Sequence, residues 1–405
     1  MTVSPGFERV EEVFRAQLAS GEEIGAAFAV YHRGRCVVDL WGGLADRASG
    51  QPWVRDTRVV VFSITKGFAA MALALLADRG RFAWDAPVAD YWPGFARGGK
   101  AEITVRQLFN HAAGLPVLDV PFTLAEVCDP AHDARLVDAL ERQVPAWEPG
   151  KDQGYHGITF GMYAKVFFTR IAGESMGTFL SREWFEPLGA DASLGRPASV
   201  ARLYPPSFLQ RVAGIAGAPR GNEARIARGL LAPSSLARRV FANPWAGGLE
   251  AYAAPAVVAA ELPWASATAS AQGIARAYLP LSLDGEVEGR RFLSRGAIAP
   301  LHARQSWVER DRVLQKPLGW SQGFLKDETH LFSPTRAAFG HPGIGGSLGW
   351  CDPENQLAIG YAMNRLDWRV RSPRALALCR AVYAAIGGDA SVPLAGIECS
   401  PGGHS

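Results

Sequence analysis

Hydrophobic positions near the start of the chain repeat first with helical and then with strand spacing. Over residues 7–19 apolar side chains recur every three or four positions, which predicts an amphipathic helix. Residues 25–31 and 35–41 are two apolar runs separated by Arg33-Gly34, a pattern typical of a β-hairpin. Residues 59–62 predict a further short strand. An apolar helical run follows from residue 63 to about 78, and Gly80 is placed to cap its end.

From about residue 85 the pattern becomes mainly helical. Residues 195–260, rich in Pro, Ala and Gly, allow no clear assignment. After about residue 315 strand patterns return, with a turn at 352–355, and a last helix is predicted at 373–386. The tail, 396–405, is expected to be frayed. The predicted helices cover 105–109, 124–127, 134–143, 160–171, 176–180 and 272–279, and the predicted strands cover 318–325, 337–341, 347–351 and 356–363.

This order of elements predicts a mixed α+β or α/β fold, in which an antiparallel sheet flanked by helices carries a mostly helical second lobe. Residues 1–84 and 290–405 are expected to form one discontinuous α/β domain. Residues 85–289 are expected to form the mainly helical domain. Clefts form at such junctions, and residue 63 lies close to this one.

Composition and charge narrow the possible functions. The chain has 405 residues, of which 48% are hydrophobic and 20% charged, so a large core is feasible. The net charge is +3 and no basic run resembles a nucleic-acid footprint, so we expect no nucleic-acid partner. No signal peptide and no apolar run of 18 residues is found, so we expect a cytoplasmic protein without a membrane partner.

The cysteines and histidines predict neither disulfides nor a metal site. Five cysteines are scattered, odd in number and without C-x-x-C spacing, so free thiols are expected. The eight histidines are dispersed, and no phosphate loop or dinucleotide fingerprint occurs, so we expect no metal and no cofactor. The sequence leaves the oligomeric state open. The cysteines are Cys36, Cys128, Cys351, Cys379 and Cys399.

A serine and a lysine stand three residues apart where the short strand gives way to the apolar helix. Ser63-Ile64-Thr65-Lys66 is an S-x-x-K tetrad. If the helix begins at Ser63, its hydroxyl and the Lys66 amine come within hydrogen-bond reach, because residues three apart share one helix face. The serine would also lie at the positive end of the helix dipole. A buried lysine with a lowered pKa can remove the hydroxyl proton. The alternative is a plain helix cap followed by an exposed lysine.

Two glycine-rich segments can complete an acyl-transfer site. Tyr155 stands in the loop 148–157, ahead of a predicted helix, where a tyrosine can reach into a cleft and act as a base. Residues 339–347 form a strand end that breaks into glycines, so a ligand can approach the backbone there. The N–H groups of Ile344 and Ser63 can then form an oxyanion hole. In the alternative interpretation Tyr155 is a packed loop aromatic and His341 a structural hydrogen-bonding residue.

The ordered set of S-x-x-K at Ser63, Tyr155-His156-Gly157, and His341-Pro342-Gly343 resembles the serine β-lactamase-like superfamily. It is most similar to the family VIII carboxylesterases, which are themselves similar to class C β-lactamases. The runs 104–116 and 272–276 support the resemblance, which covers about residues 7–388. The resemblance implies that Ser63 is the acylated nucleophile, that Lys66 shares or relays its proton, and that Tyr155 is the general base. It also implies an oxyanion hole at Ser63 and Ile344 and a pocket that includes His156, His341 and Gly343.

Two departures favour neutral esters over β-lactams. Gly157 stands where β-lactamases carry the Asn of Y-x-N, and His341 stands where many carry the Lys of K-T-G. Both losses weaken recognition of an anionic, amide-bearing substrate. If His341 were protonated at low pH, weak β-lactam turnover would remain feasible.

The sequence therefore predicts a serine carboxylesterase that hydrolyses short- to medium-chain carboxylic esters, with a small-molecule ester as its partner. Three alternatives remain open. The same site can transfer the acyl group to an alcohol or amine. It can act as a β-lactamase or as a D-amino-acid peptidase or amidase. The chain can also be a non-catalytic sensor that is acylated slowly. Aromatic candidates for the pocket walls, each more typical of a core, are Phe122, Trp264, Trp320 and Trp350.

One motif competes with this assignment. Residues 345–349, Gly-Gly-Ser-Leu-Gly, satisfy the G-x-S-x-G pattern of α/β-hydrolases. That pattern requires a strand, a sharp turn and then a helix, whereas Ser347 leads into a predicted strand. Only His404 follows as a candidate histidine. Ser347 is therefore expected to begin a strand and not to be the nucleophile.

Overall fold

The computed structural model describes residues 1–218, 221–326, 331–369 and 371–387. The predicted frayed tail and Cys399 lie outside these residues. The four cysteines within them are free thiols.

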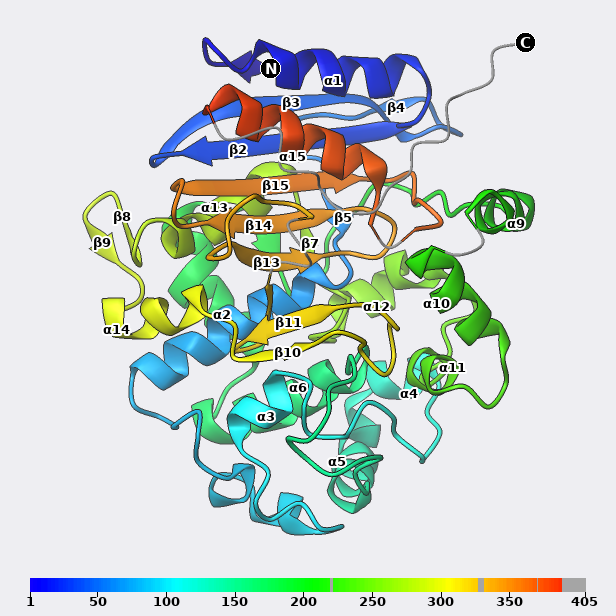
Figure 1. Cartoon of the computed structure of the whole chain (residues 1–405), viewed down its shortest axis with the longest axis vertical. Helices are drawn as coiled ribbons and strands as arrows, with labels where there is room; N and C mark the ends of the chain where they lie inside the picture. The colour runs from blue at the N-terminus through cyan, green and yellow to red at the C-terminus, as the bar shows by residue number, and fades with distance from the viewer. Residues whose placement is uncertain (219–220, 327–330, 370, 388–405) are drawn as a thin grey trace.

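An antiparallel sheet built from both ends of the chain forms the upper part of the molecule (Figure 1). Its first strands come from residues 2–52 and its last from residues 306–363, and the two groups meet where β2 pairs with β15. The predicted mixed fold with an antiparallel sheet flanked by helices is confirmed. In sheet order the strands are β1 (Thr2–Val3), β3 (Arg35–Asp46), β2 (Gly25–His32), β15 (Leu357–Met363), β14 (Leu348–Asp352), β13 (Phe339–Pro342), β12 (Phe324–Lys326), β11 (Leu318–Ser321) and β10 (Ser306–Val308), and β4 (Gln51–Pro52) pairs with β3.

Two hairpins show where strand prediction held and where it did not. The predicted hairpin around Arg33-Gly34 joins β2 to β3, and both turn residues have positive φ, 52° and 77°. Residues 318–325, predicted as one strand segment, are instead two strands. Gln322 and Gly323 both have positive φ, 46° and 87°, and turn the chain back on itself between β11 and β12.

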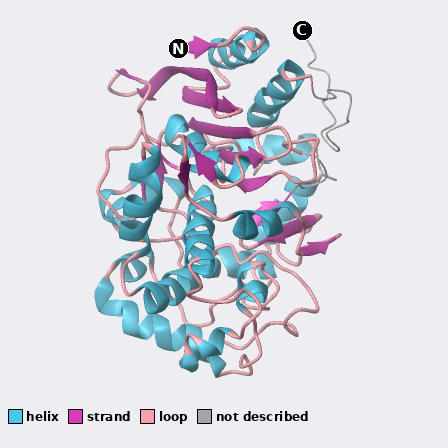
Figure 2. Cartoon of the chain, turned by 90° about the vertical axis from the view of Figure 1, so that its left-hand side faces the viewer, coloured by secondary structure: helices cyan, strands magenta, loops and turns pink. Residues whose placement is uncertain are grey.

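Helices cover both faces of the sheet. Helices α1 (Glu8–Ala19) and α15 (Pro373–Ala385) pack against each other over one face, and α13 (Ala271–Ser282) lies across the other (Figures 1 and 2). Because α13 contacts β2, β14 and β15, a segment placed in the predicted helical domain packs on the sheet. The predicted domain boundaries stay a prediction.

Helix α2 (Ile64–Asp78) is the central buried element. Thirteen of its fifteen residues are buried, as expected for a helix that is apolar all round. It contacts strands β12, β13 and β14 on one side and helices α6 and α7 on the other. Gly80, at φ 67°, follows its end as predicted. Ser63, at the start of this helix, therefore lies between the sheet and the helical part.

The helical part contains the predicted helices with shifts of a few residues at their ends. The segment 195–260, unassigned from sequence, holds short helices separated by loops. The α-helices here are α3 (Val105–Phe109), α4 (Leu124–Cys128), α5 (Asp133–Arg142), α6 (Thr159–Ala172), α7 (Met176–Leu180), α8 (Glu186–Leu188), α9 (Phe208–Gly217), α10 (Asn222–Leu231), α11 (Leu236–Phe241), α12 (Pro255–Ala259) and α14 (Arg295–Ile298). A small sheet joins β5 (Val59–Val60), β7 (Thr268–Ala269) and β6 (Ala192–Ser193), and a separate ribbon pairs β8 (Glu286–Val287) with β9 (Arg290–Arg291).

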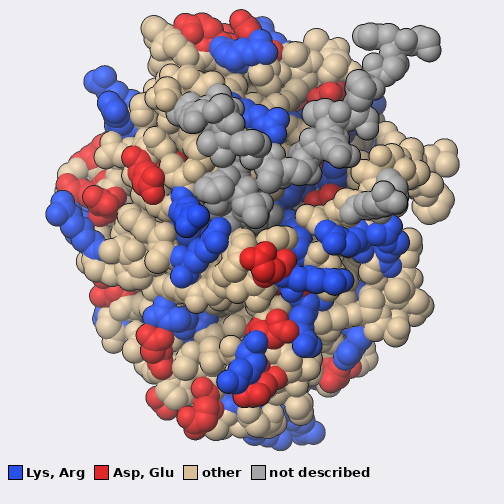
Figure 3. Space-filling model, in the orientation of Figure 1, with Lys and Arg blue, Asp and Glu red and all other residues tan. Residues whose placement is uncertain are grey.

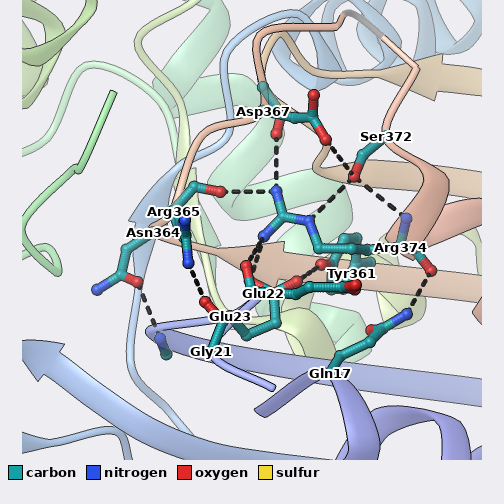
Figure 4. Close-up of polar contacts among 12 residues, drawn as sticks. Gln17, Gly21, Glu22, Glu23, Tyr361, Asn364, Arg365, Asp367, Ser372 and Arg374 are labelled. Carbon is teal, nitrogen blue, oxygen red and sulfur yellow. Dashed lines mark hydrogen bonds and ion pairs between the residues drawn. The ribbon is translucent and has the colours of Figure 1, made fainter. Parts of the chain in front are cut away.

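A buried polar cluster ties the N-terminal region to the last helix (Figure 4). The Arg374 guanidinium of α15 donates to the Glu23 carboxylate at 2.5 Å and to the carbonyl oxygens of Glu22 and Arg365. The Tyr361 hydroxyl of β15 donates to the same carboxylate. Burial raises the pKa of Glu23, and the Arg374 charge opposes this shift. The cluster therefore fastens residues 22–23, β15 and α15 to one another.

The surface carries charges of both signs interspersed over the face shown in Figure 3. Within the described part of the chain, no helix is both long enough and apolar enough to cross a membrane.

Candidate active site

A sharp bend in the backbone places Ser63 at the start of α2. Phe62 has a positive φ of 48°, which is uncommon for a residue with a side chain. Ser63 itself is the helix N-cap, and its carbonyl accepts the Lys66 N–H at 3.0 Å. The bend turns the chain from β5 into the helix.

The structure brings together the three residues expected to carry the chemistry. Ser63 Oγ lies 3.1 Å from Lys66 Nζ and 3.2 Å from Tyr155 Oη. Lys66 also donates to the Trp264 carbonyl at 3.1 Å. The lysine is fully buried, and burial lowers its pKa well below the usual value. A neutral amine is therefore accessible at lower pH than for a free lysine, and it can accept the serine proton.

Tyr155 is held by aromatic neighbours and by the lysine. Its ring stacks on Trp320 at 5.6 Å between centroids, with an interplanar angle of 8°. Lys66 Nζ lies 5.1 Å from the centre of the same ring. Trp320, one of the four aromatic candidates, thus lies in the site. Phe122 and Trp350 pack in the core, and Trp264 contributes its carbonyl.

Asp311 fixes the backbone of Tyr155, a role that sequence analysis did not predict. Its Oδ1 accepts the N–H groups of Tyr155, Val313 and Leu314 at 3.1, 2.9 and 2.8 Å. The carboxyl group is buried, which raises its pKa to about 6, while the three N–H groups lower it. In the sequence it stands between Arg310 and Arg312, a pattern typical of an exposed loop.

His156 does not line the pocket, contrary to expectation. Its Nε2 accepts the Leu115 N–H at 3.0 Å and its Nδ1 pairs with the Gly154 carbonyl at 2.7 Å, so both ring nitrogens are used within the protein. The backbone N–H of His156 donates to His111 Nδ1 at 2.9 Å. Burial lowers the pKa of His156 to about 3, so the ring is neutral. His111 and His156 therefore support the loop 148–157, which carries Tyr155.

His341 lines the cavity as a neutral ring. Its Nδ1 pairs with the Pro342 carbonyl at 2.8 Å, and within the described residues its buried Nε2 has no hydrogen-bond partner. Burial first, and then the Lys66 charge, lower the pKa of His341 well below the usual value. This shift disfavours the protonation of His341 at low pH that the sequence left feasible. A neutral ring cannot replace the lysine that attracts a β-lactam carboxylate.

Gly343 leaves room for a tight approach of two segments. A Cβ at this position would lie 2.1 Å from Ser347 Oγ and 2.6 Å from the Val61 carbonyl oxygen. Gly343 itself is not among the lining residues of the cavity, whereas Pro342 and Ile344 on either side are. Its role in the structure is to let residues 342–344 lie against the bend that carries Ser63.

The two N–H groups expected to form an oxyanion hole border the same cavity. Ser63 and Ile344 both line it. Neither backbone N–H donates a hydrogen bond to any described residue, whereas the N–H groups of Ile64 and Gly343 donate to the carbonyls of Val61 and Ser347. Two unused donors beside the Ser63 hydroxyl suit stabilisation of a developing oxyanion.

The cavity in front of Ser63 is small and largely apolar, about 50 Å³. Arg371 is the charged member of its lining, and its guanidinium also lies 6.0 Å from the centre of the Phe332 ring. Phe241 comes from the segment that allowed no assignment from sequence. The lining residues are Ser63, Tyr155, Phe241, Leu314, Leu318, Trp320, Leu325, His341, Pro342, Ile344 and Arg371.

Ser347 lies outside this cavity and precedes β14. Its hydroxyl is buried and lies 3.4 Å from the Val61 carbonyl oxygen, to which it donates. Its carbonyl accepts the Gly343 N–H at 2.8 Å. These contacts give Ser347 a structural role in the 343–347 turn. Among the described residues no group of three or more His, Cys, Asp or Glu side chains could hold a metal ion.

Comparison with known proteins defines the family. The family model described as Beta-lactamase matches residues 10–382, so the chain belongs to the beta-lactamase family. The Esterase/beta-lactamase LipL of Mycobacterium tuberculosis is 35% identical over 378 residues, covering 89% of this chain and 82% of that protein.

Solved structures of esterases are also similar to this chain. A family VIII carboxylesterase is 34% identical with a TM-score of 0.79, covering 95% of this chain and 99% of that one. EstA from Arthrobacter nitroguajacolicus Rue61a is 31% identical with a TM-score of 0.81, covering 96% and 98%. The predicted resemblance is thereby confirmed, and the chain is an esterase-type serine hydrolase of this family.

Proposed function

We propose that this chain hydrolyses short- to medium-chain carboxylic esters through an acyl-enzyme on Ser63. The observation that carries the proposal is the position of Ser63 Oγ, within 3.2 Å of both Lys66 Nζ and Tyr155 Oη. The Ser63 hydroxyl oxygen accepts hydrogen bonds from Tyr155 and from Lys66, a buried lysine with a lowered pKa, so two groups stand ready to take the serine proton.

In the proposed reaction, Ser63 Oγ attacks the ester carbonyl carbon. Its proton passes to Tyr155 as general base, with Lys66 sharing or relaying it. The N–H groups of Ser63 and Ile344 bind the oxyanion. Collapse of the intermediate expels the alcohol, which takes the proton. A water molecule then attacks the acyl-enzyme, gives its proton to the same pair, and releases the acid as Ser63 regains its proton.

Two features of the cavity support neutral esters as substrates. Its walls are mostly apolar, with Arg371 as the charged member of the lining, and His341 is neutral, so the particular position that carries a lysine in many β-lactamases offers no cation. The volume also supports short acyl groups: with about 10–15 Å³ needed for each water-sized centre, about 50 Å³ holds roughly four such centres. A butyryl group is of this order.

The test is intact mass spectrometry and p-nitrophenol release on wild type, Ser63→Ala and Ser347→Ala. With p-nitrophenyl butyrate and, separately, a fluorophosphonate, we expect stoichiometric labelling of the wild type at Ser63 and rapid turnover of the ester. Ser63→Ala should lose labelling and at least about 1000-fold in kcat, as removal of a nucleophile does. Ser347→Ala should keep most of its activity.

Two other outcomes of this experiment would contradict the proposal. Labelling of Ser63 without ester turnover would replace hydrolysis by acyl transfer or sensing. Activity that survives in Ser63→Ala but is lost in Ser347→Ala would overturn the assignment of the nucleophile.

A further inference from the structure

The ring of Phe241 occupies the space into which a side chain at position 157 would project. A Cβ on Gly157 would lie 2.6 Å from Phe241 Cε1, 3.0 Å from Cζ and 3.1 Å from Val240 Cγ1. Real Cβ atoms essentially never come within 3.0 Å of a neighbour, so no larger residue fits at 157 while the ring stays in place. The Phe241 ring therefore fills the volume that the missing side chain of Gly157 leaves open.

Phe241 is also part of the wall in front of the nucleophile. It lines the cavity together with Ser63, and its ring lies 6.4 Å from that of Tyr155 at an interplanar angle of 44°. A cavity of this size leaves little space beyond the ring. The aromatic side chain thus stands where a longer acyl group would have to extend.

The helix that carries Phe241 is firmly anchored. Val240, the preceding residue, is buried in the core. Two residues further on, the Asn243 side chain donates to the Leu118 and Val120 carbonyls at 2.7 and 2.9 Å and accepts the Phe122 N–H at 2.9 Å. These three hydrogen bonds fasten the end of α11 to residues 118–122. The ring is consequently a fixed wall.

We propose that Phe241 sets the acyl-chain limit of this enzyme, by filling the volume that Gly157 leaves open and closing the cavity in front of Ser63. The inference rests on the proposed esterase function and identifies the residue that determines its substrate class. Short acyl groups fit in front of the ring, and medium-length chains meet it and react more slowly. Still longer acyl chains, and acyl groups that need a polar side chain at position 157, are excluded.

The experiment compares p-nitrophenyl acetate, butyrate and octanoate on wild type, Phe241→Leu and Phe241→Ala. We expect the ratio of kcat/KM for octanoate to that for acetate to rise at least about 10-fold in Phe241→Ala and less in Phe241→Leu. Truncation opens an apolar space, and each added buried methylene contributes about 0.8 kcal/mol. Phe208→Ala is the matched control, since that ring is 76% exposed on α9, and its ratio should equal that of the wild type.

A second pair of variants tests the complementarity directly. Gly157→Asn should lose at least about 10-fold in kcat/KM on butyrate, because its side chain displaces the ring beside Tyr155. Adding Phe241→Ala to Gly157→Asn should restore most of that loss. Full activity of Gly157→Asn alone, or no rescue in the double variant, would contradict the proposal.

If kcat/KM depends on acyl-chain length in both Phe241 variants as it does in the wild type, the acyl-chain limit is overturned, even if Ser63 is acylated as proposed. Absence of Ser63 acylation in the wild type would instead overturn the proposed function. If Phe241→Ala does not fold, as judged by its thermal melt, Phe241→Leu decides the question. A raised octanoate-to-acetate ratio of kcat/KM supports the proposal, and a ratio equal to that of the wild type overturns it.

Discussion

Asp311 gives the enzyme a pH-sensitive support for Tyr155. With a pKa of about 6, the carboxyl group is ionised at neutral pH and accepts three N–H groups. As pH falls through about 6 it protonates and these hydrogen bonds weaken. We expect Asp311→Asn, which keeps the acceptor oxygen but does not titrate, to flatten the acid limb of the kcat/KM profile near pH 6. A profile that overlays the wild type would exclude this role.

The ionised Asp311 carboxylate supports Tyr155, but its ionisation destabilises the folded protein. Its pKa is raised from 3.8 to about 6 in the folded state, so the folded protein binds this proton more tightly than the unfolded chain does. The stabilisation is complete below about pH 4 and is lost as pH rises to about 6, a change of about 3 kcal/mol. The residue that orders Tyr155 thus lowers the stability of the protein at neutral pH.

The residues of the site differ in how far they could be predicted from the sequence. Ser63, Lys66 and Tyr155 stand in motifs whose spacing carries chemical meaning, and the structure places their reactive atoms side by side. Asp311 and Phe241 stand in no such motif, because their positions depend on irregular segments that meet only in three dimensions. The missing side chain at Gly157 was the one sign that another residue must fill that space.

At the scale of elements, strands and helices with clear periodicity were predicted within a few residues. The hairpin at 318–325 was missed because its turn, at Gln322 and Gly323, is only two residues long and both arms carry apolar residues, so the pattern predicts one strand. Strand β10, three residues long, has no periodicity to detect. Helix α13 was recognised as a helix, but its packing partner, the sheet, is set by contacts distant in sequence.

A substitution of Arg374 tests whether the buried polar cluster holds α15 against β15 and residues 22–23. Arg374→Met removes the charged partner of the buried Glu23 and leaves that carboxyl group only the Tyr361 hydroxyl as a donor. Breaking a buried pair in this way costs about 3–5 kcal/mol, so urea denaturation at pH 7 should show a loss of this order. Arg380→Met is the matched control because Arg380 is exposed on the same helix, and it should change the free energy of unfolding by less than about 0.5 kcal/mol. Equal effects of the two variants would show that the cluster does not hold α15.

At the scale of the whole molecule, the sheet cannot be completed until the chain is nearly finished. Strand β2 pairs with β15, more than 300 residues later, and α2 packs against β12, β13 and β14. The pattern of the sequence indicated that both ends share one sheet, because strand-like runs occur only near the two ends. Which strands become neighbours depends on pairing that no local pattern encodes.

A fragment of residues 1–304 should therefore not fold by itself. It lacks the strands that cover one edge of β2 and one side of α2, so buried apolar surface would be exposed. We expect no cooperative thermal transition by circular dichroism, and recovery of esterase activity when residues 305–405 are co-expressed. A sharp transition in the fragment alone would show that the first part is an independent folding unit.

The position of Ser63 on α2 has a practical meaning. This helix packs against both the sheet and the helical part, and Ser63, the proposed nucleophile, is its N-cap. Because Ser63 stands directly at the start of this buried helix, loosening of the interior would displace its hydroxyl. Loss of catalytic turnover is thus a direct readout of the global integrity of the molecule, and a simple colour assay can serve as its folding sensor.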